Sequence, residues 1–388
     1  MTMPDEISAV IDRVTRALAA TAAERDRLGG TAKAERDLLR ESGLLRLSVP
    51  LSSGGAGRSW SETLLAVRQL ARVDGSLAHL FGFHHLLLAT VRLFGDERQW
   101  SAAYRESASG TLFWGNALNP LDRRTRITAR DGAYVVDGTK TFCSGASDAD
   151  RLIVSALDDE QRLVVAALPA ARPGIRIHDD WDAFGQRQTD SGTVTFDAVP
   201  VAADELLRTP GPLGSVFASL RPCLAQLILV NVYLGIGEGA FAQGSAYTRE
   251  QARPWTSSGV ASAAEDPFVL RRYGELWVAL EGARALSDQA GQVFDEAWAH
   301  GNRLSREGRG TAAVAVATAK VAATRAGLDT ASGIFELTGA RATTRAAGMD
   351  RFWRNLRVHT LHDPIDYKLK ELGEWALGGI LPKPSFYS

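Results

Sequence analysis

Residues 126–145, RITARDGAYVVDGTKTFCSG, mark the point at which the pattern of the chain changes. Short runs of β-branched and aromatic residues stand here between two Asp-Gly pairs, Asp131-Gly132 and Asp137-Gly138, which favour tight turns. Similar runs continue to about residue 208, where prolines end the pattern. The sequence therefore predicts an antiparallel β domain over residues 111–208.

Helical patterns flank this β domain on both sides. Apolar residues recur at helical spacing from Ile7 to Leu18, and comparable segments continue to about residue 110. Beyond residue 208 the helical period returns, and no proline interrupts the chain between Pro267 and Pro364. We predict a mainly α protein with a central β domain: an N-terminal helical domain (1–110), the β domain (111–208) and a C-terminal four-helix bundle (209–388).

Two glycine-rich stretches resemble nucleotide-binding loops without meeting their requirements. Residues 52–57, SSGGAG, follow an apolar run at 44–50 that is predicted as extended, but no Lys-Ser/Thr pair follows the glycines, so we predict a turn. Residues 227–240, LILVNVYLGIGEGA, place the third glycine one position early for a dinucleotide fingerprint. We predict a buried helix whose glycines permit close packing, and no NAD(P)H-binding domain.

Composition narrows the classes of function. The chain has 388 residues, a formal net charge of −1 and 45% hydrophobic residues, so nothing favours binding to nucleic acid or to an anionic membrane. No apolar run approaches the ~20 residues of a membrane span, and the start of the chain lacks the features of a signal peptide. With only two cysteines, Cys143 and Cys223, a reduced cytoplasmic protein is expected.

Residues 350–364, DRFWRNLRVHTLHDP, hold the strongest candidate site. His359 and His362 lie three residues apart, and Asp363 follows directly. Histidine titrates near neutral pH and often transfers protons in enzymes. No cysteine or further histidine lies nearby to complete a metal shell, so no metal is predicted. The alternative is that these histidines only pack in the core or at an interface.

A second histidine-rich stretch is HLFGFHH at residues 79–85. One or two of its histidines can be packing residues, but three beside aromatic side chains favour the wall of a pocket. His79 and Phe83 are the candidates from this stretch, together with Trp298 from the C-terminal helices.

The order of helices, β domain and helical bundle, together with local motifs, resembles the acyl-CoA dehydrogenase superfamily of flavoproteins. Residues 137–145 are similar to the family strand that places an aromatic ring and a hydroxyl against the flavin. The resemblance implies that Phe142 packs on the flavin ring and that Ser144 hydrogen-bonds around flavin N5. It also implies that Arg253 reaches the flavin phosphates, often across a subunit interface, and that Arg341 meets a flavin phosphate. Thr338 and Gly339 stand where the family has its adenine-side Gly-Gly-x-Gly motif, so they are cofactor-binding candidates as well.

Departures from the dehydrogenase motifs are similar to the dibenzothiophene monooxygenase branch of this superfamily. These departures are His-Thr-Leu-His-Asp-Pro at 359–364, Asn116, and the final Pro-Ser-Phe-Tyr-Ser. That branch consists of two-component (group D) monooxygenases, which receive reduced flavin, FMNH2 or FADH2, from a separate NAD(P)H:flavin reductase. With O2 they form a C4a-hydroperoxyflavin. The implied substrate is an apolar aromatic heterocycle, either a sulfur heterocycle or an indole-type ring.

The resemblance assigns a role to each candidate. His362 is the proton-transfer residue, and Ser144 and Asn116 are the other catalytic candidates. His359 and Asp363 are assigned to the cofactor site: His359 either orients the flavin or packs at the subunit interface, and Asp363 either orients His362 or acts as a base. A homo-oligomer, and by family likeness a tetramer, is expected. Two alternatives stay open: an acyl-CoA dehydrogenase-like or nitroalkane oxidase-like enzyme with Asp363 as base, and a non-catalytic helical scaffold.

Overall fold

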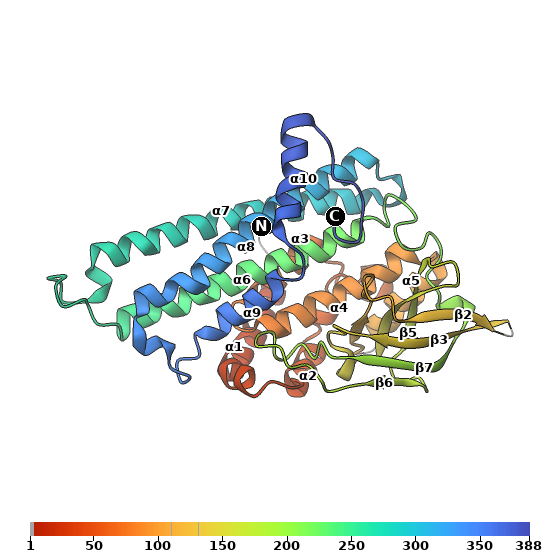
Figure 1. Cartoon of the computed structure of the whole chain (residues 1–388), viewed down its shortest axis with the longest axis horizontal. Coiled ribbons are helices and arrows are strands. Elements are labelled where there is room, and N and C mark those ends of the chain that lie inside the picture. Colours follow the sequence, from red (N-terminus) through yellow and green to blue (C-terminus); the bar gives the residue numbers. More distant parts are fainter. Residues whose placement is uncertain (1–3, 110, 131) are drawn as a thin grey trace.

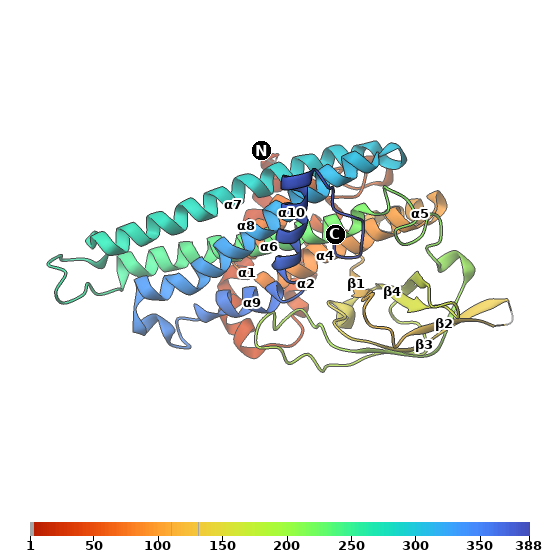
Figure 2. The ribbon, with the colours of Figure 1, turned by 45° about the horizontal axis from the view of Figure 1, so that its top comes forward.

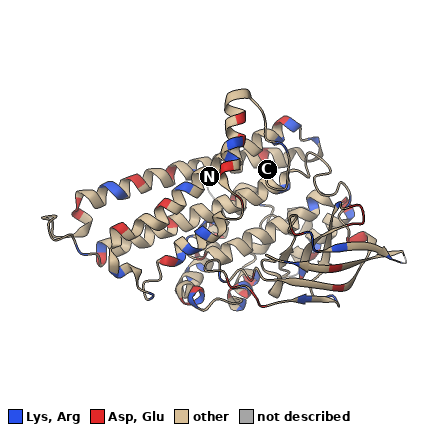
Figure 3. Ribbon diagram, in the orientation of Figure 1, with Lys and Arg blue, Asp and Glu red and all other residues tan. Residues whose placement is uncertain are grey.

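The computed structural model describes residues 4–109, 111–130 and 132–388 (Figure 1). Residues 1–3, 110 and 131 lie outside this description, so the start of the chain, the predicted boundary at 110 and the first residue of the Asp131-Gly132 turn are not assessed. Basic and acidic residues are interspersed along the helices and strands (Figure 3).

The chain begins with helices that end where the sequence places their glycines. Gly29 ends the first helix, and Gly43 ends the second in a left-handed conformation, at φ 79°. The predicted extended run at 44–50 is wrong: Leu44–Arg46 form a 3₁₀ helix, because this compact turn buries Leu44, Leu45 and Leu47 together. The helices of this part are α1 (Asp5–Leu28), α2 (Lys33–Ser42), α3 (Trp60–Ala71), α4 (Gly75–Phe94) and α5 (Glu97–Ser109).

The strands of the described chain pair into one sheet in the order β1-β4-β2-β3-β7-β6, with β5 paired to β4. The prediction of an antiparallel domain is only partly right, since β4 runs parallel to β1 and β2. The chain leaves β3 and passes β2 to reach β4, a crossover that a simple hairpin cannot provide. The strands are β1 (Trp114–Ala117), β2 (Arg126–Arg130), β3 (Ala133–Lys140), β4 (Arg151–Leu157), β5 (Leu163–Pro169), β6 (Ile175–Ile177) and β7 (Val194–Val201).

Three long helices run side by side after the β domain, and two shorter ones follow them (Figure 1). Helix α9 packs against α6 and α8, whereas α10 packs on α8 and crosses the long helices (Figures 1 and 2). These helices are α6 (Leu220–Glu250), α7 (Pro267–His300), α8 (Arg306–Thr338), α9 (Asp350–Thr360) and α10 (Ile365–Gly378).

The glycines of α6 act as predicted, by allowing close packing inside a buried helix. A Cβ atom on Gly235 would stand 2.4 Å from the carbonyl oxygen of Arg68, and one on Gly239 would stand 2.0 Å from that of Arg72. Gly237 would bring its Cβ to 3.0 Å from the Cα of Gly327. Any larger side chain at these positions would push α6 away from α3 or α8.

Helices α4 and α6 are, by length and composition, long and apolar enough to span a membrane, although 94% of the apolar stretch of α4 and 89% of that of α6 are buried in the fold. The expectation that no apolar stretch approaches such a span is therefore wrong for these two helices. They are apolar on nearly all sides because other elements of the fold cover them. Helix α4 packs between α6 and β1, so it lies at the junction of the helical and β parts.

Candidate functional site

One wall of the candidate site comes from the β domain and carries Asn116, Phe142 and Ser144. The backbone N–H of Asn116 donates to the Ser144 carbonyl at 2.9 Å, and its side-chain Nδ2 donates to the Phe142 carbonyl at 3.3 Å. Asn116 and Ser144 are buried, whereas Phe142 is 59% exposed in a left-handed conformation, at φ 59°. An exposed aromatic ring on a strained backbone is a surface that a flat apolar ligand can cover.

The opposite wall comes from α4 and α9 and carries histidines. The ring of His79 lies 4.0 Å from that of Phe83 and 4.5 Å from that of His359, measured between centroids. Burial lowers the pKa of His79 to about 3 and that of His359 well below its usual value, so both rings are neutral. Among the described residues, neither Nδ1 atom has a hydrogen-bond partner. Two neutral imidazoles, each with a buried Nδ1 atom that lacks a partner in the described part of the chain, therefore lie side by side at this place.

The other two histidines of this stretch have structural roles. The backbone N–H of Trp114 donates to His84 Nδ1 at 3.2 Å, which leaves Nε2 to donate to the carbonyl of Leu45 at 2.9 Å. His85 Nδ1 pairs with the Ser48 hydroxyl at 2.7 Å. Of the three, His79 is the one that contacts His359 of α9, whereas His84 and His85 bond to neighbouring backbone and side-chain groups.

His362 and Asp363 lie directly after α9 and form a pair. His362 Nδ1 stands 3.0 Å from Asp363 Oδ1, and the buried Lys320 Nζ lies 3.4 Å from the same oxygen. Burial alone would raise the pKa of Asp363, but the hydrogen bond from His362 and the charge of Lys320 together hold it below its usual value. Burial lowers the pKa of Lys320 to about 8 against the opposing effect of Asp363. Asp363 is thus a fixed, ionised carboxylate that orients His362 through Nδ1.

The two walls are joined by direct packing. A Cβ on Gly145, next to Ser144, would lie 3.1 Å from the Leu80 side chain, next to His79. The loop at 186–192 bridges them as well, because the Gln186 backbone N–H donates to Asn355 Oδ1 of α9 at 2.6 Å. These contacts place the two groups of residues that the sequence singled out on elements that pack against each other. Asn116, Phe142 and Ser144 form one group, and His79, Phe83, His359, His362 and Asp363 form the other.

Trp298 does not join this group. It packs in a separate aromatic cluster on α3 and α7, with ring centroids 5.2 Å from Trp60, 5.1 Å from Phe217 and 6.1 Å from Phe294. Its assignment to the pocket stays a prediction, because its ring contacts are with this cluster and not with His79 or His359.

The residues assigned to the flavin phosphate gather at the far end of the bundle. Arg253, Thr338, Gly339 and Arg341 line a cavity of about 320 Å³ between the α6–α7 loop and the end of α8. This end lies opposite the β domain (Figure 1). Within one chain these residues are therefore separate from Ser144 and His362.

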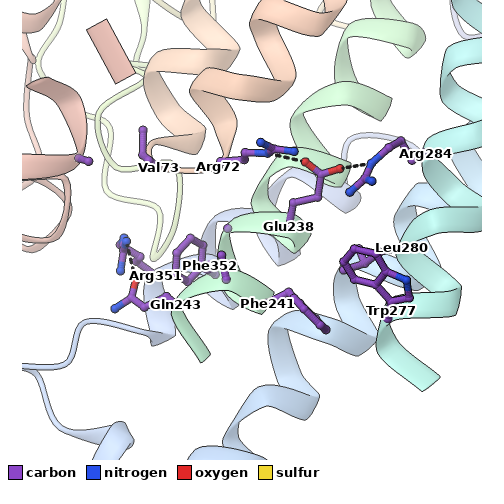
Figure 4. Close-up of a pocket in the computed structure, with 13 residues that line it drawn as sticks. Arg72, Val73, Glu238, Phe241, Gln243, Trp277, Leu280, Arg284, Arg351 and Phe352 are labelled. Atoms are coloured by element: carbon purple, nitrogen blue, oxygen red, sulfur yellow. Dashed lines mark hydrogen bonds and ion pairs between the residues drawn. The ribbon is translucent and has the colours of Figure 1, made fainter. Parts of the chain in front are cut away.

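Another cavity, of about 640 Å³, lies between α1, α6, α7 and α9 and contains none of the predicted residues (Figure 4). Its most polar feature is Glu238, which accepts from Arg72 at 2.6 Å and from Arg284 at 2.9 Å. The walls are otherwise mainly apolar, with Phe241 and Trp277 on one side. The two ion pairs of Glu238, with Arg72 and with Arg284, link the end of α3 to α6 and α7.

Sequence reasoning missed the polar residues that support the site. Thr189 and Ser191 stand behind Ser144 in an irregular loop that has no recognisable pattern. Lys320 had a usable signal, since a lysine within the alanine-rich run 311–331 is unusual on a helix face that is otherwise apolar.

Comparisons with known proteins agree with this arrangement. Family models of acyl-CoA dehydrogenase match residues 5–111 (N-terminal domain), 115–199 (middle domain) and 227–367 (C-terminal domain). A probable FMNH2-dependent monooxygenase, SfnC of Pseudomonas putida, is 54% identical over 100% of this chain and 98% of its own. A dibenzothiophene monooxygenase of Rhodococcus erythropolis is 45% identical over 95% of this chain and 92% of its own.

Solved structures give the same result. Methanesulfinate monooxygenase MsuC of Pseudomonas fluorescens superposes with a TM-score of 0.97 at 54% identity, covering 100% of both chains. TdsC of Paenibacillus sp. A11-2, solved with FMN and indole, gives 0.95 at 42% identity, covering 98% of this chain and 100% of its own. This chain therefore belongs to the acyl-CoA dehydrogenase family, and within it to the flavin-dependent monooxygenases related to dibenzothiophene monooxygenase.

Proposed function

We propose that this protein is the oxygenase component of a two-component monooxygenase, which takes FMNH2 from a separate NAD(P)H:flavin reductase and uses O2. The observation that carries the proposal is the pairing of two walls. Exposed Phe142 lies with Ser144 and Asn116 on the β side, and the neighbouring helices carry neutral His79 and His359 and the His362–Asp363 pair. The relatives named as FMNH2-dependent, or solved with FMN, favour FMN over FAD.

The residues present fit a flavin. Phe142 offers an exposed ring for the isoalloxazine, and Ser144 would hydrogen-bond at N5, with Asn116 beside it. Reduced flavin, when bound, supplies the electrons for activating oxygen. His362 would hold and move a proton through its free Nε2, because Asp363 already occupies Nδ1. His79 and Phe83 would contact the substrate and help to exclude water.

Asp363 is a poor candidate for a proton-abstracting base of the dehydrogenase or nitroalkane oxidase kind. It is buried and paired with both His362 and Lys320, which lowers its tendency to accept a proton. A scaffold without activity is also disfavoured, since the relatives that are 45–54% identical over nearly the whole chain are named as monooxygenases.

The substrate is proposed to be an organosulfur compound or an indole-type ring. An aromatic heterocycle follows from the sequence and from relatives named for dibenzothiophene or solved with indole. A small alkanesulfinate is a second candidate, because the solved relative named for methanesulfinate is 54% identical over the whole chain.

The assembly is proposed to be a homotetramer in which the far end of each bundle reaches the flavin of a neighbouring copy. Arg253 and Arg341 share a cavity there but lie apart from the Ser144 wall of their own chain. Nearby Trp255 and Phe268 are 74% and 79% exposed, as side chains of an interface would be in an isolated subunit. A cytoplasmic location, where a reductase could supply flavin, is part of the same proposal.

The test is reconstitution. Purified protein is mixed with a flavin reductase, NADH, FMN and ¹⁸O2, and dibenzothiophene, indole or methanesulfinate is added in separate reactions. Mass spectrometry should find one ¹⁸O atom in a product that appears only when both proteins are present. Oxidation of an acyl-CoA or a nitroalkane without a reductase would instead establish one of the alternative activities.

A further inference from the structure

Ser144 is held against the loop at 186–192 by the backbone. The N–H of Cys143 donates to the Gly192 carbonyl at 3.0 Å, and the N–H of Gly145 donates to the Thr189 carbonyl at 2.8 Å. These two bonds place the Ser191 hydroxyl beside that of Ser144, with 2.7 Å between the two Oγ atoms.

The contact between the two serines continues as a chain of hydroxyl groups. Ser191 Oγ lies 2.7 Å from Thr189 Oγ1, and Thr189 Oγ1 lies 2.9 Å from the Gln186 carbonyl oxygen. The four residues are between 1% and 8% exposed, so the chain is shielded from solvent. The order is therefore Ser144, Ser191, Thr189 and finally a carbonyl.

The last member of this chain fixes the direction of every bond in it. The Gln186 carbonyl also accepts from Trp181 Nε1 at 2.8 Å and from the Thr189 N–H at 3.2 Å. Because a carbonyl can only accept, the Thr189 hydroxyl, which lies 2.9 Å from this oxygen, donates its single proton to it. Thr189 must then accept from Ser191, and Ser191 must accept from Ser144. The opposite direction would leave the oxygens of Thr189 and Gln186 2.9 Å apart without a proton between them. The Ser144 proton thus points into the protein, and its lone pairs are left for a ligand.

We propose that Thr189 and Ser191 are positioning residues that hold the Ser144 hydroxyl as a hydrogen-bond acceptor toward the flavin. This inference rests on the proposed function, in which Ser144 meets flavin N5. Reduced flavin carries a hydrogen on N5 and donates it, whereas oxidised flavin has only a lone pair there. An acceptor at this position favours the reduced form, which is the form that a separate reductase delivers.

The loop is anchored firmly enough to keep this direction. Asp190, between Thr189 and Ser191, stands in a left-handed conformation at φ 46°. Its carboxylate accepts from Ser147 at 2.5 Å and from Thr31 at 2.9 Å, and it also pairs with the fully buried Arg36. Three neighbouring segments therefore oppose a rearrangement of the loop.

The test compares the affinities of the intact protein for oxidised and reduced FMN. Oxidised FMN is titrated in air by fluorescence, and FMN reduced beforehand is titrated under nitrogen. Wild type should bind the reduced form more tightly. Ser191→Ala removes the acceptor of the Ser144 proton, so Ser144 can donate elsewhere. Thr189→Val removes the acceptor of the Ser191 proton, so Ser191 can donate to Ser144 instead of accepting from it. Each should lower the ratio of the two affinities by about 2- to 10-fold, which is what one hydrogen bond contributes.

Two further variants make the measurement specific. In a Ser144→Ala background, Ser191→Ala should cause no further change in the ratio, since the hydroxyl that it orients is gone. Thr330→Val removes another buried threonine hydroxyl, on α8, and should leave the ratio unchanged. Thr189→Val preserves the side-chain shape, so it decides the question even if Ser191→Ala folds poorly.

An unchanged ratio in Thr189→Val, with flavin still bound, would overturn the inference and leave the proposed function standing. A wild-type protein that binds neither form of FMN would contradict both. A ratio that falls in Thr189→Val but not in Thr330→Val supports the inference.

Discussion

The two walls of the candidate site differ in the chemistry of their side chains. The β wall consists of an amide, a phenyl ring and hydroxyl groups, none of which titrates near neutral pH. The helical wall carries His79, His359, His362 and Asp363, with Lys320 behind them. From this difference we infer separate functions for the two walls. The β wall binds the flavin through fixed hydrogen bonds, and the helical wall transfers protons and contacts the substrate.

If this division is right, substitutions in the two walls should have separable effects. Changes in the helical wall should alter turnover and the response to pH while flavin affinity stays nearly constant. Changes in the β wall should alter flavin affinity first. An experiment in which substitutions in one wall change both turnover and flavin affinity would contradict this division.

The largest effect is expected from His362→Ala. Oxygenation in the reconstituted system should fall by about 10²–10⁴-fold, the usual contribution of a positioned proton-transfer group. FMN affinity should change little, because the β wall is intact. Asp363→Asn is the matched comparison and should be milder in its effect on turnover, since Asp363 acts through His362. The reverse ranking would return Asp363 to the role of base and favour the oxidase alternative.

The next effect concerns stability. Lys320→Met removes a partner from a buried ion pair and leaves the Asp363 carboxylate with less compensation, which typically destabilises a protein by about 3–5 kcal/mol. Thermal unfolding should show a clear fall in Tm. Lys370→Met is the control, because Lys370 is exposed and its pair with Glu374 lies on the surface. A double variant, Lys320→Met with Asp363→Leu, should recover part of the lost stability.

The sequence predicted the β wall better than its supports, for a physical reason. Phe142 and Ser144 lie in one local motif. The close packing of α6 was equally predictable, because its glycines lie within a few residues of one another. By contrast, the Ser144–Ser191 contact joins residues 47 apart and depends on backbone pairing outside any regular strand. The parallel placement of β4 is likewise set by a crossover that leaves no local pattern.

Trp298 shows how little residue type alone says about position. A tryptophan in an apolar helix is a reasonable pocket candidate, but the packing of α7 against α3 places Trp298 beside Trp60 and Phe294. Which face of a helix meets the site is decided by tertiary packing, and periodicity alone gives no direction toward a particular cavity.

A smaller effect is expected from Phe142→Ala in the β wall. An aromatic contact contributes about 0.5–1.5 kcal/mol beyond the area that it buries, so FMN affinity should weaken by at least about 3-fold. Because Phe142 is largely exposed, the fold should be little affected. The pH dependence of the residual turnover should match that of wild type. A changed pH profile with unchanged flavin affinity would contradict the division between the walls.

The smallest effect should appear in the response of stability to acid. The pKa of Asp363 is lowered in the folded protein, so the unfolded chain binds the proton more readily. The resulting stabilisation is fully present above the usual aspartate pKa of about 4 and is lost as the pH falls below it. Urea unfolding from pH 7 to pH 3 should therefore show a shallower loss of stability in Asp363→Asn than in wild type. Asp12→Asn, on the exposed face of α1, should keep the wild-type slope. Equal slopes in Asp363→Asn and wild type would mean that the carboxylate is not held ionised by His362 and Lys320, and the helical wall would then lack the fixed charge that orients its proton-transfer residue.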